Sequence, residues 1–265
     1  VDFTRSRNIA SVAVTFSPHP VTILKKQPAS LIYPLFQKIA LLEKCGVDAV
    51  WVLEFDSALS QLNAKEFLFF LQKHCPFERI FLGEDACFGH GRTGTPLQVR
   101  AWAENFQIAY QPLQYCQDTP ISSSAIRNLI QKGALNELPL WLGRPYALSL
   151  EKTSGLQQGR KMGFPTLNFA VQDLALLPFG VYAVSLNAGK GEIPAIANLG
   201  VAPTLHLDRC PLLEVHVLSD QVPSIDRKAD ITFKAFIRLE KKFDSLSDLQ
   251  EQIQEDIAFC RQLRM

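Results

Sequence analysis

The sequence predicts an α/β domain with a parallel sheet, followed by a small antiparallel β-barrel that ends in a helix. In the first half, apolar β-branched runs alternate with helical periodicity, which is typical of strands joined by crossover helices. From about Tyr146 the pattern changes to short apolar runs separated by Gly, Pro and Asn, which is typical of an antiparallel barrel or sandwich. The tail repeats apolar residues at helical spacing.

The first half alternates strand and helix signals. In chain order we expect a strand at 10–16, a helix at 35–44, a strand at 49–55, a helix at 64–74, a strand at 79–82 and a helix near 97–106. Two shorter helices are expected at 122–132 and 135–142. Because a strand–helix–strand unit joins parallel strands, this order predicts a parallel sheet with helices on its faces.

The second half is expected to be mostly β. Its apolar runs lie at 181–186, 193–199, 212–218 and 231–237. In the tail helix, Ser247 and Gln250 are placed as a capping box, and one face carries Leu249, Ile253, Ile257 and Cys260. The change of pattern predicts a boundary near 143–147, and therefore two domains, residues 1–145 and 146–265.

Composition bounds the class of protein. The 265 residues are 47% hydrophobic and 20% charged, which excludes a disordered or collagen-like chain. The net charge is +1 and neither half has a large basic excess, so no nucleic-acid partner is expected. The longest charge-free stretch, 174–189, contains Pro178 and Gly180 and is too short to span a bilayer, so no membrane partner is expected. Six scattered cysteines without a CxxC pair indicate reduced thiols and a cytoplasmic protein.

A glycine-rich segment early in the second domain is the first candidate site. Gly155, Gly159 and Gly163 surround Arg160 and Lys161, so backbone N–H groups and two cations could approach phosphates closely. The segment is not a Walker A loop, because no Gly-Lys-Ser/Thr opens a helix there. Spacing alone favours the alternative of an ordinary glycine-rich surface loop.

Two further candidates involve oxygen-bearing side chains on extended segments. Thr166 and Asn168 are two residues apart, so they project to one side, where their neutral oxygens suit a Mg²⁺ ion held mainly by phosphates and water. Glu214 and His216 share one face of an otherwise aliphatic strand, where the carboxylate could act as a general base. The alternative, which the strand by itself favours, is that both face solvent on the outside of a barrel.

The first domain has polar residues at a helix start and after two strands. Ser122, Ser123 and Arg127 combine N–H groups, hydroxyls and a guanidinium into a candidate anion site, whereas the simpler interpretation makes one serine a helix cap. His19 follows the first strand and Asp85 the third, at the end of the sheet where α/β proteins bind ligands. A loop histidine between prolines and an ordinary turn are the alternatives at these two positions.

Taken in order, these segments resemble the bacterial family of bifunctional riboflavin kinase/FAD synthetases. In the second half the resemblance rests on Gly159-Arg160-x-x-Gly163-Phe164-Pro165-Thr166-x-Asn168, Gly180-Val181-Tyr182, Asn198-x-Gly200-x-x-Pro203-Thr204, Leu213-Glu214-Val215-His216 and Lys242-Phe243-Asp244-Ser245. In the first half it rests on Thr15-Phe16-x-Pro18-His19-Pro20, Gly83-x-Asp85-x-x-Phe88-Gly89, Ile121-Ser122-Ser123-x-x-Ile126-Arg127 and Leu142-Gly143-Arg144.

The resemblance implies a Rossmann-like nucleotidylyltransferase domain with a parallel sheet, followed by a six-stranded antiparallel riboflavin-kinase β-barrel with a C-terminal helix. The barrel would transfer the ATP γ-phosphoryl group to riboflavin, giving FMN. Thr166 and Asn168 would help to hold Mg²⁺, and Glu214 would orient or deprotonate the attacking hydroxyl. Asn198 and Thr204 would line the substrate pocket, and the nucleotide would lie against Gly155, Gly159, Arg160, Lys161, Gly163 and Pro165.

The first domain would transfer AMP from ATP to FMN, giving FAD, with nucleotide contacts from His19, Asp85, Ser122, Ser123 and Arg127. Family members open with Gly-x-Phe-Asp-Gly-Val-His-x-Gly-His, which binds the ATP phosphates, and nothing in this chain matches that stretch. We therefore expect it to lie upstream of Val1, and we expect this chain to make FMN but not FAD. Ala86 also replaces a usual phenylalanine, and residues 223–225 replace a usual Tyr-Gly.

Two alternatives to the two-activity enzyme stay open. In one, the chain is a riboflavin kinase only, with a structural or regulatory N-terminal domain. In the other, it is a non-catalytic flavin-binding module, although storage of flavin would not require Thr166, Asn168 and Glu214 together. The expected small-molecule partners are riboflavin, FMN, FAD and ATP, with Mg²⁺ as the cofactor.

Overall fold

The computed structural model describes residues 1–100, 102, 107–154, 163–189, 191–201, 210–219, 225 and 227–263. The chain divides into two compact units, one of residues 1–29 with 39–121 and the other of residues 30–38 with 122–265. The segment 122–145, which the sequence assigns to the first domain, thus groups by contacts with the second unit. No helix in the described ranges is both long and apolar enough to cross a membrane.

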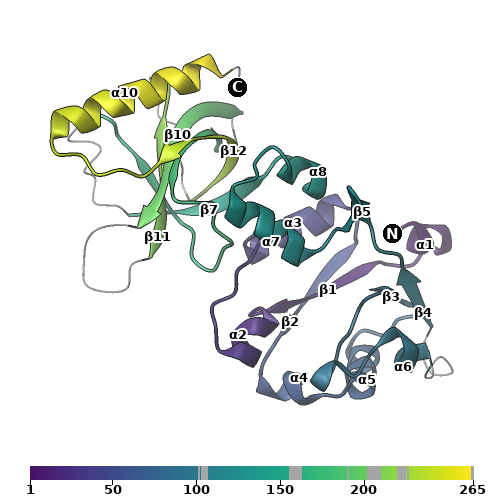
Figure 1. Ribbon diagram of the computed structural model, residues 1–265. Coiled ribbons are helices and arrows are strands. Elements are labelled where there is room, and N and C mark those ends of the chain that lie inside the picture. The colour runs from purple at the N-terminus through teal and green to yellow at the C-terminus, as the bar shows by residue number, and fades with distance from the viewer. Residues whose placement is uncertain are drawn as a thin grey trace. The chain divides into compact units, whose positions relative to one another are not determined.

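The first unit is an α/β unit whose strands pair in parallel, as predicted (Figure 1). β1 pairs with β2 and β3 pairs with β4, so the described strands make two two-stranded parallel sheets rather than one continuous sheet. A small antiparallel pair, β5 with β6, completes it. In chain order the elements up to residue 121 are α1 (Asp2–Arg7), β1 (Val12–Ser17), α2 (Pro20–Lys25), α3 (Leu35–Lys44), which spans the change of unit at residue 39, β2 (Ala49–Glu54), α4 (Ser57–Gln61), α5 (Ala64–His74), β3 (Ile80–Gly83), a 3₁₀ turn (His90–Arg92), α6 (Pro96–Arg100), β4 (Ile108–Gln111), β5 (Tyr115–Cys116) and β6 (Thr119–Pro120).

Helix α5 shows why the sequence folds locally in this way. Asn63 and Glu66 form a reciprocal capping box at its start, which satisfies two N–H groups of the first turn. Leu68 on its apolar face is fully buried and packs in one cluster with Val99 of α6. The predicted helix near 97–106 is found at Pro96–Arg100, and residues 103–106 lie outside the described ranges.

The second unit contains a closed barrel of six antiparallel strands in the order β10-β11-β8-β7-β12-β9. This confirms the predicted six-stranded barrel with a C-terminal helix. Four strands coincide with the predicted apolar runs, and the two additional strands are β7 and β8. The elements are α7 (Ser123–Lys132), α8 (Leu138–Leu142), β7 (Ala147–Thr153), β8 (Leu167–Ala170), β9 (Gly180–Asn187), β10 (Glu192–Val201), β11 (Pro211–Val217), β12 (Lys228–Leu239) and α10 (Leu246–Gln262).

A short segment distant in sequence, residues 30–38, is hydrogen-bonded to the barrel within the same unit. The Gln37 side chain donates to the Ala147 carbonyl oxygen at 2.8 Å and accepts from the Ser149 N–H at 2.9 Å, so it pairs with β7 as a neighbouring strand would. Leu31 donates its N–H to the Asp173 carbonyl oxygen at 2.7 Å. These contacts explain why the segment belongs to the barrel unit.

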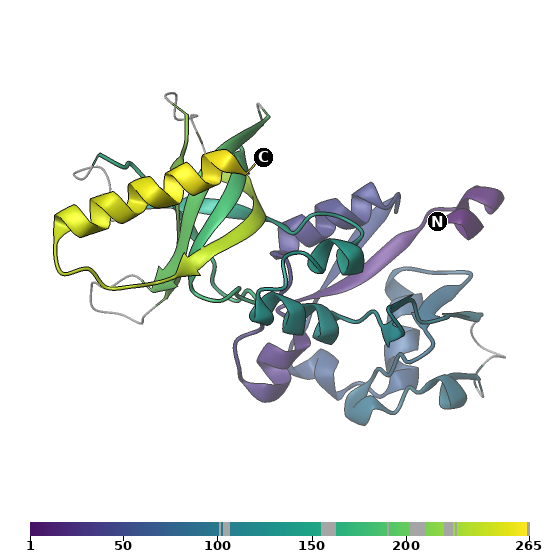
Figure 2. The same cartoon turned by 45° about the horizontal axis from the view of Figure 1, so that its top comes forward.

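Helix α10 covers part of the outside of the barrel (Figure 2). Cys260 of α10 packs with Val181 and Ala183 of β9 and with Ile196 of β10. Because β9 has the barrel core on one face and α10 on the other, nearly all of its residues are buried. This explains why β9 reads as a continuous apolar run rather than an alternating one.

The start of α10 corrects one prediction. The helix begins at Leu246, and the Ser245 side chain accepts a hydrogen bond from the Asp248 N–H at 3.1 Å. The capping box predicted at Ser247 and Gln250 is therefore wrong by two residues, because Ser247 already lies in the first helical turn. Ser245 instead has the extended backbone that a cap requires.

A buried ion pair joins α10 to the last barrel strand. Asp256 is 3% exposed, and its carboxylate accepts hydrogen bonds from Nε and Nη2 of Arg238, the latter at 2.8 Å. Gln252, one turn earlier on α10, also donates to Asp256, at 3.2 Å. The stability of the fold should depend on both members of this pair, because losing one leaves the other charge buried and unpaired.

We predict that Asp256→Asn lowers the free energy of unfolding by roughly 3–5 kcal/mol, because it leaves the Arg238 guanidinium without its charge partner. The measurement is urea-induced unfolding followed by circular dichroism. Glu151→Gln is the matched control, since the ion pairs that Glu151 forms with described residues are exposed, and the substitution should cost less than about 1 kcal/mol. Equal effects of the two substitutions would contradict the prediction.

Candidate active site

Four polar side chains lie in one row across the barrel, because their strands pair in register. Asn198 on β10 is directly opposite Glu214 on β11, and Glu214 is directly opposite Asn168 on β8. Thr153 on β7 continues the row beyond Asn168. Directly opposite residues of antiparallel strands project to the same face with their Cβ atoms about 5 Å apart. The barrel thus places next to one another residues that are far apart in sequence.

The row lies on the outer face of the barrel. Leu213 and Val215, the neighbours of Glu214 along β11, are fully buried in the interior, so Glu214 points outward. His216 shares the outer face, as the sequence predicted. Glu214 and His216 are both half-buried, whereas the solvent-facing alternative would leave them exposed.

Asn168 brings an unpaired oxygen into the row. The residue is 6% exposed, and within the described part of the chain its buried Oδ1 has no hydrogen-bond partner. A buried carbonyl oxygen without a partner costs about 1–3 kcal/mol, so a ligand is the physically reasonable complement. An amide oxygen is a suitable ligand for a hard divalent cation such as Mg²⁺. Thr166 precedes β8 by one residue and could contribute its hydroxyl from the same stretch of chain.

The Glu214 carboxylate has an unusual electrostatic environment. Burial raises its pKa above the ordinary glutamate value, and the negative charge of Glu240 raises it further. Glu240 follows the end of β12, and its Oε1 accepts a hydrogen bond from Asn198 Nδ2 at 3.2 Å. The sequence did not single out Glu240, because no local pattern indicates that the end of β12 reaches β10.

His216 fixes the segment that leads into β8. Its Nδ1 lies 2.9 Å from the Pro165 carbonyl oxygen, to which it must donate, and its ring packs edge-on against Phe164 with 5.6 Å between the centroids. Gly163 has a φ of +86°, which glycine adopts without strain. These contacts hold Pro165 and Thr166 beside β11. The remaining predicted residues of this half, Gly155, Gly159, Arg160, Lys161 and Thr204, lie outside the described residues.

In the first unit, His19 and Asp85 both follow carboxyl ends of parallel strands, as the sequence predicted. His19 comes after β1 and caps α2, where its Nδ1 accepts a hydrogen bond from the Val21 N–H at 3.3 Å. Asp85 comes after β3 in a turn closed by the Ala86 N–H, which donates to the Gly83 carbonyl oxygen at 2.9 Å. Both residues therefore have local structural roles as well.

In the second unit, Ser122 and Arg127 have identifiable structural partners. Ser122 is the N-cap of α7, and its side chain accepts from the Ala125 N–H at 3.1 Å. The simpler interpretation of the serine run is therefore confirmed for Ser122, while Ser123 is the first residue of the helix. Arg127 Nε donates to the Ser30 carbonyl oxygen, which ties α7 to the segment 30–38. The anion site at these residues stays a prediction.

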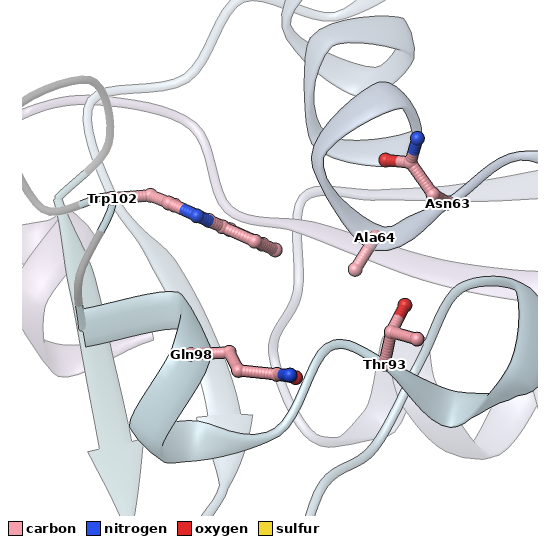
Figure 3. Close-up of a pocket in the computed structure, with 5 residues that line it drawn as sticks. All are labelled: Asn63, Ala64, Thr93, Gln98 and Trp102. Atoms are coloured by element: carbon pink, nitrogen blue, oxygen red, sulfur yellow. The ribbon is translucent and has the colours of Figure 1, made fainter.

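The first unit also contains a pocket of about 470 Å³ that the sequence did not indicate (Figure 3). Gln98 and Trp102 extend from one side towards Asn63 and Ala64 at the start of α5, with Thr93 beside them. Two of its polar side chains already have partners, since Asn63 caps α5 and the Thr93 hydroxyl donates to the protein backbone at 3.1 Å. The pocket therefore offers a ligand mainly apolar surface.

The two halves of the chain match two different protein families. A riboflavin kinase family model matches residues 142–264, and an FAD synthetase family model matches residues 1–125. The bifunctional riboflavin kinase/FMN adenylyltransferase of Escherichia coli K12 is 33% identical over 264 residues, which cover 97% of this chain and 84% of the relative. Its counterparts in Haemophilus influenzae and Bacillus subtilis are 34% and 29% identical and cover 88% and 94% of this chain, and 76% and 81% of their own lengths.

A solved structure shares the fold. A crystal structure described as a macrolide-efflux protein from Streptococcus pneumoniae is similar with a TM-score of 0.81 at 25% identity, covering 98% of this chain and 86% of that one. Together, the barrel, the parallel-stranded unit and the two family models define a transferase of flavin cofactor biosynthesis with a kinase domain and a nucleotidyltransferase domain. The chain belongs to the bifunctional riboflavin kinase/FMN adenylyltransferase family.

We predict that the Glu214 carboxyl stays protonated to higher pH than an ordinary glutamate, because burial and the Glu240 charge both disfavour its carboxylate form. The measurement is a ¹³C NMR titration of the glutamate side chains, with Glu214→Gln used to assign the resonance. A midpoint at or below the ordinary glutamate value would contradict this electrostatic description.

Proposed function

We propose that residues 146–265 are a riboflavin kinase domain, which transfers the γ-phosphoryl group of ATP to the 5′-hydroxyl of riboflavin and releases FMN and ADP. The observation that carries this proposal is the row of Asn168, Glu214 and Asn198, in which a buried unpaired oxygen lies beside a half-buried carboxylate. The names of the relatives support the same reaction. Residues 1–145 would be the FAD synthetase domain.

Glu214 would act on the attacking hydroxyl. Its carboxylate accepts a hydrogen bond from the riboflavin 5′-hydroxyl and takes the proton as the oxygen bonds to the γ-phosphorus and the bond to ADP breaks. A raised pKa suits this task, because a carboxylate that binds its proton more tightly is the stronger base once deprotonated. Phosphoryl transfer requires little other covalent chemistry, so orientation of the hydroxyl is a large part of the contribution.

Thr166 and Asn168 would hold Mg²⁺, with the remaining ligands supplied by ATP phosphates and water. When bound, the cation neutralises charge on the phosphates and aligns them for in-line transfer. The buried Oδ1 of Asn168 supports this assignment, because it is an oxygen that needs a partner. His216 would keep Thr166 close to Asn168 through its contact with the Pro165 carbonyl oxygen.

The nucleotide and flavin contacts follow from the same arrangement. Gly163 and Pro165 lie next to the proposed cation ligands, so they would border the ATP phosphates together with Gly155, Gly159, Arg160 and Lys161. Asn198 lies on the other side of Glu214 and would contact the substrate, together with Thr204. Riboflavin, FMN, FAD and ATP are thus the proposed small-molecule partners.

FMN adenylylation by the first domain is the second candidate function. The match of the FAD synthetase model to residues 1–125 favours it, as does the position of His19 and Asp85 after carboxyl ends of parallel strands. Ser122, Ser123 and Arg127 would complete the nucleotide contacts.

We also propose a cytoplasmic location, supported by the six cysteines, all of which are free thiols.

We predict that the chain converts riboflavin to FMN with ATP and Mg²⁺, and that Glu214→Gln lowers kcat roughly 10²- to 10⁴-fold through loss of the base. Chromatographic separation of the flavins measures both. Glu251→Gln, an exposed Glu-to-Gln change on α10, is the matched control and should retain the wild-type rate. Absence of FMN with the wild-type chain, or undiminished FMN with Glu214→Gln, would overturn the kinase assignment.

The second candidate is tested by following FAD when FMN and ATP are supplied to the protein. FAD and pyrophosphate formed in equal amounts would support adenylyl transfer. FMN made from riboflavin without any FAD would instead support the alternative of a kinase with a structural or regulatory N-terminal domain.

A further inference from the structure

We infer that Glu240 is a positioning residue of the proposed kinase site, which holds the Asn198 side chain in the row. This inference rests on the proposed function, because it assigns Glu240 a role through Asn198, a residue of that site. It concerns a residue that neither the sequence motifs nor the expected metal and phosphate contacts include.

Glu240 is hydrogen-bonded directly to Asn198 of the row. Asn198 Nδ2 donates to Glu240 Oε1 at 3.2 Å, and Asn198 is directly opposite Glu214 in the β10–β11 register. The Glu240 carboxylate is therefore separated from Glu214 by a single cross-strand pair. Because an amide has two donors and one oxygen, fixing Nδ2 on Glu240 also fixes the direction in which the Asn198 oxygen points.

Gly200 leaves the space that the Glu240 carboxylate occupies. Gly200 lies two residues after Asn198 on β10 and shares its face. A Cβ placed on Gly200 would overlap the Glu240 carboxylate, with Oε1 the nearest atom. Any other residue at position 200 would thus displace Glu240 from Asn198. Gly200 and Asn198 together form the binding position of this carboxylate on the outer face of the barrel.

The chain on both sides of Glu240 is attached to α10. Two residues earlier, Arg238 is held by the buried Asp256 of α10. One residue later, Lys241 Nζ donates to Gln252 Oε1, also on α10, and lies 4.9 Å from the centre of the Phe243 ring. Glu240 therefore sits between two attachments to the same helix, which restricts where its carboxylate can go.

The test compares kcat and KM for FMN formation by the wild type, Glu240→Gln and Glu240→Ala. Glu240→Gln keeps an oxygen that can accept from Asn198 Nδ2 and should stay close to the wild type, whereas Glu240→Ala removes that oxygen and should raise the KM for riboflavin several-fold more than it lowers kcat. Glu251→Gln on the exposed face of α10 is the control and should change neither constant. Gly200→Ala, which keeps the carboxylate but displaces it from Asn198, should raise KM in the same way as Glu240→Ala.

A second readout does not depend on activity. Binding of riboflavin alone, followed by the quenching of its fluorescence, should weaken in Glu240→Ala and Gly200→Ala but not in Glu240→Gln, while thermal unfolding confirms that all three proteins are folded. If the wild type makes FMN but neither KM nor the riboflavin affinity changes in Glu240→Ala, the role of Glu240 is wrong and the kinase assignment stands. If the wild type makes no FMN, the proposed function is wrong, and a riboflavin affinity that is unchanged in Glu240→Ala would overturn the inference independently.

Discussion

The antiparallel register of β10, β11 and β8 is the constraint on which the proposed site depends. It sets Asn198, Glu214 and Asn168 side by side, and it does so together with the core, since Leu213 and Val215 must face inward. A slip of one residue would bury the Glu214 carboxylate and expose these aliphatic side chains. The same free energy of apolar burial that stabilises the barrel therefore also holds the candidate catalytic residues in place.

The C-terminal helix connects the stability of the barrel to the chemistry of its surface. Its packing buries Val181, Ala183 and Ile196, and its Asp256 fixes Arg238 at the end of β12. The chain then continues directly to Glu240, so the helix also restricts the position of the second carboxylate. The helix is thereby linked, through Glu240 and its hydrogen bond with Asn198, to the proposed site.

The sequence predicted those features that depend on local pattern. Periodicity located α3 and α5, and apolar runs located β9 to β12, because burial of one face imposes a repeat on the residues. It missed β8 as a strand, because four residues are too few to show a repeat, and it placed the cap of α10 at Ser247 rather than Ser245. Glu240 could not be predicted, because its contact with Asn198 is made 42 residues away across the barrel. Residue spacing already marked Asn168 and Glu214 as candidates and the resemblance to a known family gave their expected roles, while their adjacency required the register.

The most direct test of the proposed kinase site at Asn168 and Glu214 is a crystal structure of the chain with riboflavin, Mg²⁺ and a non-hydrolysable ATP analogue. We expect the cation on the Asn168 Oδ1 oxygen and the riboflavin 5′-hydroxyl within hydrogen-bond reach of the Glu214 carboxylate, about 3 Å away. A flavin and nucleotide bound elsewhere on the barrel, with Asn168 and Glu214 contacting neither, would contradict it.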